Sequence, residues 1–112
     1  MPIANCLVTQ SCFKNIDASV DPILLWSKES TKSTEQMTIN LTTIEKQLGS
    51  PYAAMVTLQL PSLWTRTDIS LLQVGLVKAL AKYFDISPEE IHIVTQIIHS
   101  GHVVEKSNEI VW

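Results

Sequence analysis

The feature that most constrains the fold of this chain is an internal repeat. The segment Ser33–Asn40 aligns without gaps with Ser87–Val94, which lies 54 residues further along (87 − 33), and at the same offset Ile44 then aligns with Ile98. Each copy has a polar start followed by an apolar-alternating run, a pattern that predicts a short turn entering a strand. An internal repeat of this kind indicates duplicated architecture, so we expect two copies of one supersecondary unit.

The second unit is the clearer of the two. The run Ala53–Leu60 predicts a strand that Pro61 ends, and Thr67 or Asp68 could cap the helix that follows. Apolar residues at spacings of three and four predict the buried stripe of that helix. They are Ile69, Leu72, Leu76, Leu80 and Phe84, widened by Val77 and Ala81. The returning strand is predicted over Glu90–Ile98.

The first unit is less regular. We predict its opening strand over Pro2–Thr9 and its returning strand over Gln36–Thr43. Pro22 fits the first turn of a helix with Asp21 as cap, so the helix is predicted from Pro22 to about Thr31. The stretch Lys14–Val20 stays ambiguous.

Two tandem strand-helix-strand units predict an α/β fold with a four-stranded sheet and both helices on one face. The right-handed crossover makes the strands of each unit parallel. At 112 residues, one domain over 1–112 is expected, with pseudo-repeats at 2–44 and 53–98 and a tail at 99–112.

The strands are also too apolar for a sheet with one face in water. Two helices can cover only one face, so we expect a second copy of the chain to cover the other. A mixed core with a few exposed aliphatic side chains is the alternative.

Composition excludes several function classes. The net charge is −3 and the eight basic residues are scattered, so we expect no nucleic-acid partner and no membrane-binding patch. No apolar run approaches the roughly 18–20 residues of a membrane span, and no basic leader with a cleavage site is recognisable. Cys6 and Cys12 do not suggest a disulfide framework. Together these features lead us to expect a cytoplasmic protein.

Pro2 stands at the head of the first predicted strand. A small second residue favours removal of the initiator Met1, which would leave a secondary amine at the chain terminus. A free α-amine titrates near pH 7.7–8.0, and an apolar environment lowers its pKa. Pro2 is therefore a candidate general base at neutral pH. The alternative is that Met-Pro is only a translation start.

Several segments in a fixed order resemble the tautomerase superfamily, and at this length its macrophage migration inhibitory factor-like branch. Leu80–Ile93 is similar to the family's second helix leading into its fourth strand, and Lys32–Ile39 to its lysine before the second strand. Gly49-Ser50 is similar to its small-residue loop. The resemblance covers nearly the whole chain, with length differences around the first helix and around residues 45–66.

The resemblance implies a symmetric homotrimer with active sites between subunits. It also implies that Pro2 moves a proton between carbon and oxygen of a small α-keto or enol carboxylate, such as phenylpyruvate, without a cofactor. Lys32 would hold the carboxylate or polarise the carbonyl. The alternative for Lys32 is a solvated cation at a helix end, and Lys28, one turn earlier, is its rival.

Three further positions correspond to the family's substrate pocket and depart from its pattern. Pro61 stands where the family offers a backbone amide, which proline lacks. His92 stands where an aromatic ring is common, and Val94 replaces a polar side chain. These departures keep a second hypothesis open, a non-catalytic trimeric binding or interaction protein. The sequence also does not distinguish whether the reaction would be tautomerisation, hydration or dehalogenation. A ligand-sensing regulatory domain is a third possibility.

The remaining chemistry-bearing residues give weaker signals. Arg66 is interpreted as a solvated loop residue. His99 and His102 are two ligands where zinc needs three or four, so no metal site is expected. The tail that ends at Trp112 is expected to form a short strand or hairpin against a neighbouring subunit, with Trp112 as its anchor or as a frayed end.

Overall fold

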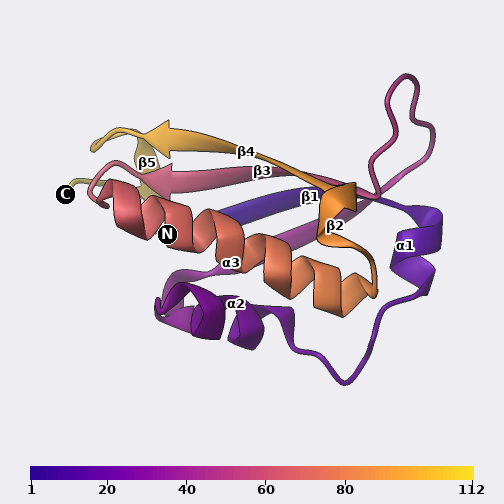
Figure 1. The fold of residues 1–112 in the computed structure, drawn as a ribbon. Coiled ribbons are helices and arrows are strands. Elements are labelled where there is room, and N and C mark those ends of the chain that lie inside the picture. Colours follow the sequence, from indigo (N-terminus) through magenta and orange to yellow (C-terminus); the bar gives the residue numbers. More distant parts are fainter.

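The computed structural model describes residues 1–112 and contains one four-stranded sheet, two main helices and a small hairpin (Figure 1). The elements of the first unit are β1 (Ile3–Thr9), α1 (Gln10–Lys14), α2 (Pro22–Ser30), η1 (Thr34–Gln36) and β2 (Thr38–Ile44). Those of the second unit are β3 (Ala54–Pro61), α3 (Arg66–Phe84), η2 (Pro88–Glu90) and β4 (Ile91–Ile98). The tail forms β5 (Val103–Glu105) and β6 (Asn108–Ile110).

The sheet has the strand order β2-β1-β3-β4. The strands of each unit are parallel, and β1 and β3 join the two units in antiparallel pairing. Figure 1 shows α2 and α3 on the same face of this sheet. The predicted fold class is therefore confirmed.

The repeated segments take the same local structure in both units. Ser33 caps η1 by accepting from the backbone N–H of Glu35, and Ser87 caps η2 by accepting from that of Glu89. In each case a single turn of 3₁₀-helix leads into the returning strand. The repeat thus predicted the turn and strand at both places.

Some boundaries differ from the prediction by one or two residues. The larger correction is at α3, which begins at Arg66 with Thr65 as its cap, because the Thr65 hydroxyl accepts from the N–H of Asp68 at 3.2 Å. Thr67 and Asp68 therefore lie inside the helix. The ambiguous stretch contains the end of α1, which starts after the Thr9 cap.

The core lies between the sheet and the two helices. Alternate residues of β1 and β3 point into it, among them Cys6, Val56 and Leu58. Trp26 of α2 is fully buried, and its Nε1 donates to the backbone oxygen of Leu72 in α3 at 3.0 Å. This bond fixes α2 against α3.

The opposite face of the sheet carries no helix and mixes polar with apolar side chains. Asn40 donates to Asn5 at 2.8 Å across β2 and β1, while Leu7 and Val94 are about half exposed. The expectation of apolar residues on both faces was therefore only partly right, since the most apolar positions of β3 alternate toward the helices.

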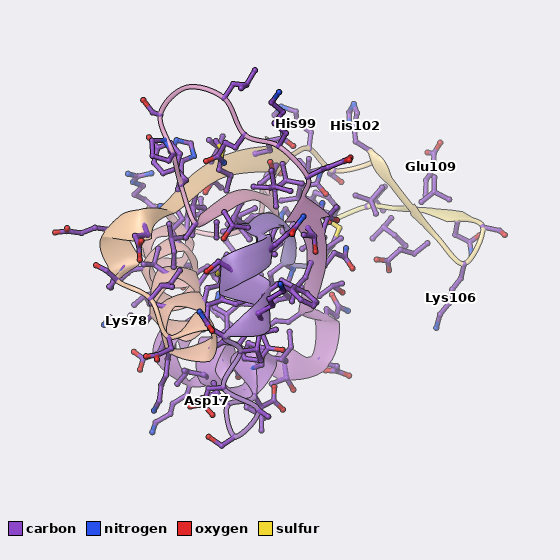
Figure 2. The ribbon with its side chains drawn as sticks, turned by 90° about the vertical axis from the view of Figure 1, so that its right-hand side faces the viewer. Asp17, Lys78, His99, His102, Lys106 and Glu109 are labelled. Atoms are coloured by element: carbon purple, nitrogen blue, oxygen red, sulfur yellow. The ribbon has the colours of Figure 1, made fainter.

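The tail folds back as a hairpin that projects from one end of the sheet (Figure 2). Trp112 is held by its own chain, because its Nε1 donates to the hydroxyl of Ser62 at 2.9 Å and its backbone N–H to that of Ser100 at 2.8 Å. None of the helices combines the length and apolarity needed to cross a membrane.

Candidate functional site

Pro2 is buried at the start of β1, beside the start of β2. Its carbonyl accepts from the backbone N–H of Thr38 at 3.0 Å, which ties residue 2 to the neighbouring strand. With Met1 attached, the nitrogen of Pro2 belongs to a peptide bond and the free amine belongs to Met1. That amine donates to Oε1 of Gln36 at 3.2 Å. Partial burial lowers the pKa of the Met1 amine, and the charge of Glu105 acts in the opposite direction.

Lys32 is placed by the end of α2. The helix stops at Ser30, and Thr31 takes a left-handed conformation with φ of 63°. The backbone of Lys32 is then fixed on both sides, since its carbonyl accepts from the hydroxyl of Ser27 and its N–H donates to that of Ser30. A β-branched residue rarely adopts positive φ, so this turn is strongly determined by its surroundings.

The two predicted catalytic residues line one cavity. It has a volume of about 160 Å³ and is lined by Met1, Pro2, Lys32, Ser33, Glu35, Gln36 and Trp64. Pro2 and Lys32 meet there because β1 and β2 are parallel neighbours that start side by side, with Ile3 opposite Thr38. The crossover through α2 returns the chain to the same edge, just before β2.

Lys32 is paired with an acidic side chain. Its Nζ donates to Oδ1 of Asp68 in the first turn of α3 at 2.5 Å, and both side chains are about a quarter exposed (24% and 25%). The hydrogen bond from Lys32 lowers the pKa of Asp68, and bonds from Thr65 act in the same direction. The lysine therefore reaches the cavity with part of its charge already compensated.

Five residues at this site were not identified from the sequence. Ser33, Glu35, Gln36 and Trp64 line the cavity, and Asp68 holds the lysine. Asp68 had been weighed only as a helix cap, and nothing in the sequence links position 32 with position 68. Gln36 and Glu35 lay inside the repeated segment, where only their role in the turn was considered.

Pro61 lies close to this site. It is buried at the end of β3 and lines an adjoining hollow of about 280 Å³ together with Met1, Gln36 and residues of the C-terminal hairpin. Its position beside the chain start follows from the antiparallel pairing of β1 and β3, which places Ile3 opposite Gln59. The single chain thus brings Pro2, Lys32 and Pro61 to one end of the sheet.

His92 and Val94 lie elsewhere. They line a hollow on the helix-free face together with Leu7 and Met55, and the His92 ring packs 5.1 Å from that of Tyr52. The register joins Leu7, Met55 and His92 in one row, four residues along β1 from the row of Ile3. At about 3.3 Å per residue, that separation is roughly 13 Å for His92. Val94 lies in the row of Asn5 and Thr57, two residues along β1 from the row of Ile3, and β3 separates its strand from β1. Within one chain, His92 and Val94 line the hollow on the helix-free face and not the cavity that Pro2 lines.

The remaining polar residues lie outside the cavity. Lys28 lines a different hollow of about 390 Å³, together with Asp17, Asp21 and Lys82. Arg66 is exposed at the first position of α3. His99 and His102 lie at the base of the hairpin (Figure 2), with ring centroids 6.0 Å apart. No group of three or more metal-ligating side chains occurs in the structure.

Among known proteins, similarity to this chain is found in solved structures and not in sequence comparisons. No protein-family model matches the sequence, and no curated protein matches it. Among solved structures, the R7 fused 4-OT, described as a wild-type asymmetric trimer, has a TM-score of 0.73 at 14% identity, with 96% of this chain and 94% of that chain covered.

Two further solved structures are similar over most of their length. N1, a member of the cis-3-chloroacrylic acid dehalogenase family, has a TM-score of 0.73 at 9% identity, covering 96% of this chain and 82% of that one. The macrophage migration inhibitory factor of Oncomelania hupensis has a TM-score of 0.67 at 14% identity, covering 98% and 82%. The chain thus has the fold that these solved structures share, at identities of 9% to 14%.

Proposed function

We propose that this protein is a tautomerase that interconverts the keto and enol forms of a small α-keto carboxylate, with Pro2 as general base after removal of Met1. The observation that carries the proposal is that Pro2 and Lys32, 30 positions apart (32 − 2), line the same small cavity.

The chemistry follows from the two groups. The neutral amine of Pro2 takes a proton from the carbon next to the carbonyl, and the C–H electron pair becomes the enol double bond. The Nζ of Lys32 donates toward the oxygen on which negative charge develops, which stabilises the enolate. The ammonium form of Pro2 then gives the proton to that oxygen, so atoms and charge balance and no cofactor takes part.

The basicity of Pro2 depends on its surroundings. The residue is buried, and burial disfavours the charged form of an amine and so lowers its pKa. The amine that now stands next to it, on Met1, already has its pKa lowered for this reason. We expect the amine of a trimmed Pro2 to respond in the same direction, which would keep it neutral and basic at pH 7.

A homotrimer is part of the proposal. The helix-free face of the sheet carries half-exposed Leu7 and Val94 and no covering element within the chain, and the R7 fused 4-OT is a trimer. In such an assembly His92 and Val94 of one subunit could approach Pro2 of the next, which they cannot do within one chain. Sedimentation of the trimmed protein as a trimer is the expected result, and a monomer would contradict this part.

The decisive experiment follows the ketonisation of phenylenolpyruvate by its loss of ultraviolet absorbance. Intact mass first establishes that Met1 is absent. We expect Pro2→Ala to lower kcat/KM about 100-fold or more, the usual contribution of a positioned base, and a version extended before Met1 to be equally inactive. Lys32→Met should also lose activity, whereas Lys28→Met, which changes the lysine one turn earlier, should not. Equal ketonisation rates for wild type and Pro2→Ala would contradict the proposal.

A second function is favoured by a specific observation. Pro61, next to the site, has no N–H to offer a substrate, and Val94 offers no polar group. The same scaffold could therefore bind a small keto acid without converting it. Binding of phenylpyruvate without turnover by trimmed protein would support this function.

Chloride release from 3-chloroacrylate would instead place the protein with the dehalogenases of this fold.

A further inference from the structure

We propose that Asp68 is a specificity-determining residue that restricts the Pro2–Lys32 cavity to substrates with one carboxylate and disfavours dicarboxylates. The inference rests on the proposed function, because it concerns the substrate class of that same site. It starts from the ion pair between Lys32 Nζ and Asp68 Oδ1, 2.5 Å apart.

The charge balance of the site disfavours a second negative charge on the ligand. Lys32 and, while Met1 is attached, the amine are the cations at the cavity and its adjoining hollow. The carboxylates there are Glu35 in the cavity, Glu105 in the adjoining hollow, and Asp68 on Lys32. Once Met1 is removed and Pro2 is neutral, one cation faces three carboxylates. The exposed Arg66 lines neither space.

The number of hydrogen-bond donors that Lys32 offers a ligand is limited. Asp68 occupies one of the three N–H bonds of Lys32, so two remain for a ligand. Two donors suit one carboxylate, or one carboxylate oxygen and a neighbouring carbonyl oxygen. A second carboxylate on the ligand would find no further cation and would lie close to Asp68 or Glu35.

Part of the cavity lining is apolar. The half-buried Trp64 and Pro2 both line the cavity of about 160 Å³. Apolar lining of this kind accepts a methyl, methylene or aromatic group and desolvates a second charge without pairing it, which is costly. A keto acid with one carboxylate and an apolar end therefore matches both Lys32 and this lining.

Asp68 is placed to act on Lys32 rather than on the reacting atoms. It does not line the cavity itself and lies in the first turn of α3, where Thr65 fixes its backbone N–H. It is a positioning residue: it holds the ammonium group and reduces the net attraction of the site for anions. Its removal should strengthen the binding of all anions, and of dianions most.

The test compares two keto acids with the same four-carbon skeleton, 2-oxobutyrate with one carboxylate and oxaloacetate with two. Their dissociation constants are measured by NMR titration of trimmed wild type, Asp68→Asn and Asp68→Glu. We expect wild type to prefer 2-oxobutyrate, and Asp68→Asn to shift the affinity ratio toward oxaloacetate about tenfold, as expected for one charge removed within several ångströms. Asp68→Glu keeps the charge and should retain the wild-type ratio.

The matched control is Glu29→Gln, which removes the acidic partner of Lys78 in the other ion pair, 3.7 Å long and away from the cavity. It should leave the ratio unchanged. An Asp68→Asn ratio equal to that of wild type, with both proteins folded by circular dichroism, overturns the inference, as does a wild-type preference for oxaloacetate. Because a dissociation constant is an equilibrium quantity that does not depend on whether the bound keto acid is converted, this outcome is separate from the loss of the proposed tautomerase activity, which the ketonisation assay reports.

Discussion

Gly75→Ala tests how closely α2 and α3 approach each other. Gly75 is buried in the middle of α3, and a Cβ built on it would lie 3.1 Å from the backbone nitrogen of Ser30 and 3.3 Å from the carbonyl carbon of Glu29. Favourable carbon contacts are about 3.5–4.0 Å long. The added methyl group therefore cannot be accommodated unless the last turn of α2 moves by a few tenths of an ångström.

Two effects of opposite sign decide the outcome. Alanine is a better helix former than glycine by about 1 kcal/mol. Overpacking in a well-packed core costs about 1–3 kcal/mol, and here the nearest atoms are mainly backbone, which cannot rotate away as a long side chain can. We expect the variant to be about 1 kcal/mol less stable, which corresponds to a Tm lower by roughly 4 °C in a chain of this size.

Urea unfolding followed by circular dichroism, at one fixed protomer concentration, measures this change. Val74→Ala is the matched control, because it introduces alanine at the adjacent, exposed position of α3 and should not be destabilised by contact with α2. A Gly75→Ala protein as stable as wild type, or more stable, would refute the close approach. The shift of α2 should also displace Lys32, which follows directly after its end, and so lower the ketonisation rate.

Two further predictions concern titratable groups. The hydrogen bond from Lys32 lowers the pKa of Asp68 in the folded protein. The stability that this pair contributes is therefore fully present above the carboxyl pKa of the unfolded chain, about 3.9, and is lost as the pH falls through the lower pKa of the folded state. The urea midpoint of wild type should therefore fall more steeply below pH 4 than that of Asp68→Asn, and identical pH profiles would contradict the pairing. Burial raises the pKa of the Cys6 thiol to about 12, and burial followed by the charge of Glu90 raises that of Cys12. The thiolate is the reactive form of cysteine. Both thiols should therefore react with a disulfide reagent at pH 8 only as fast as the protein unfolds. Rapid reaction without denaturant would contradict this prediction, because it would show that the thiols are accessible in the folded protein.

Local patterns predicted most of the fold because the relevant signals are short-range. The apolar stripe from Ile69 to Phe84 requires only helical spacing, and the Ser33 and Ser87 caps act within two residues. The start of α3 was misplaced because Thr65, Thr67 and Asp68 can all cap a helix, and sequence does not say which of them has extended backbone. Thr65 has it, with ψ of 164°.

The lining of the cavity was predicted only in part. Pro2 and Lys32 were predicted to share a site from their strand and helix positions together with a family resemblance. The partner of Lys32 was not, because Asp68 is 36 residues away (68 − 32) and reaches it only when α3 packs beside the end of α2. His92 and Val94 were predicted as pocket residues of a site between subunits, and within one chain they line a different hollow, on a strand that β3 separates from β1.

The sequence alone determined the two repeated units, their strand-helix-strand order and a proline at the head of the first strand, since these depend on spacing and on residues close in the chain. The tertiary structure decided which side chains share a cavity and how they are charged. Parallel pairing of β1 with β2 brought Lys32 to Pro2, and packing of α3 brought a carboxylate to Lys32. Electrostatic interactions act through space and depend on distances between atoms, so the chemistry of this site is set by packing that no local pattern encodes.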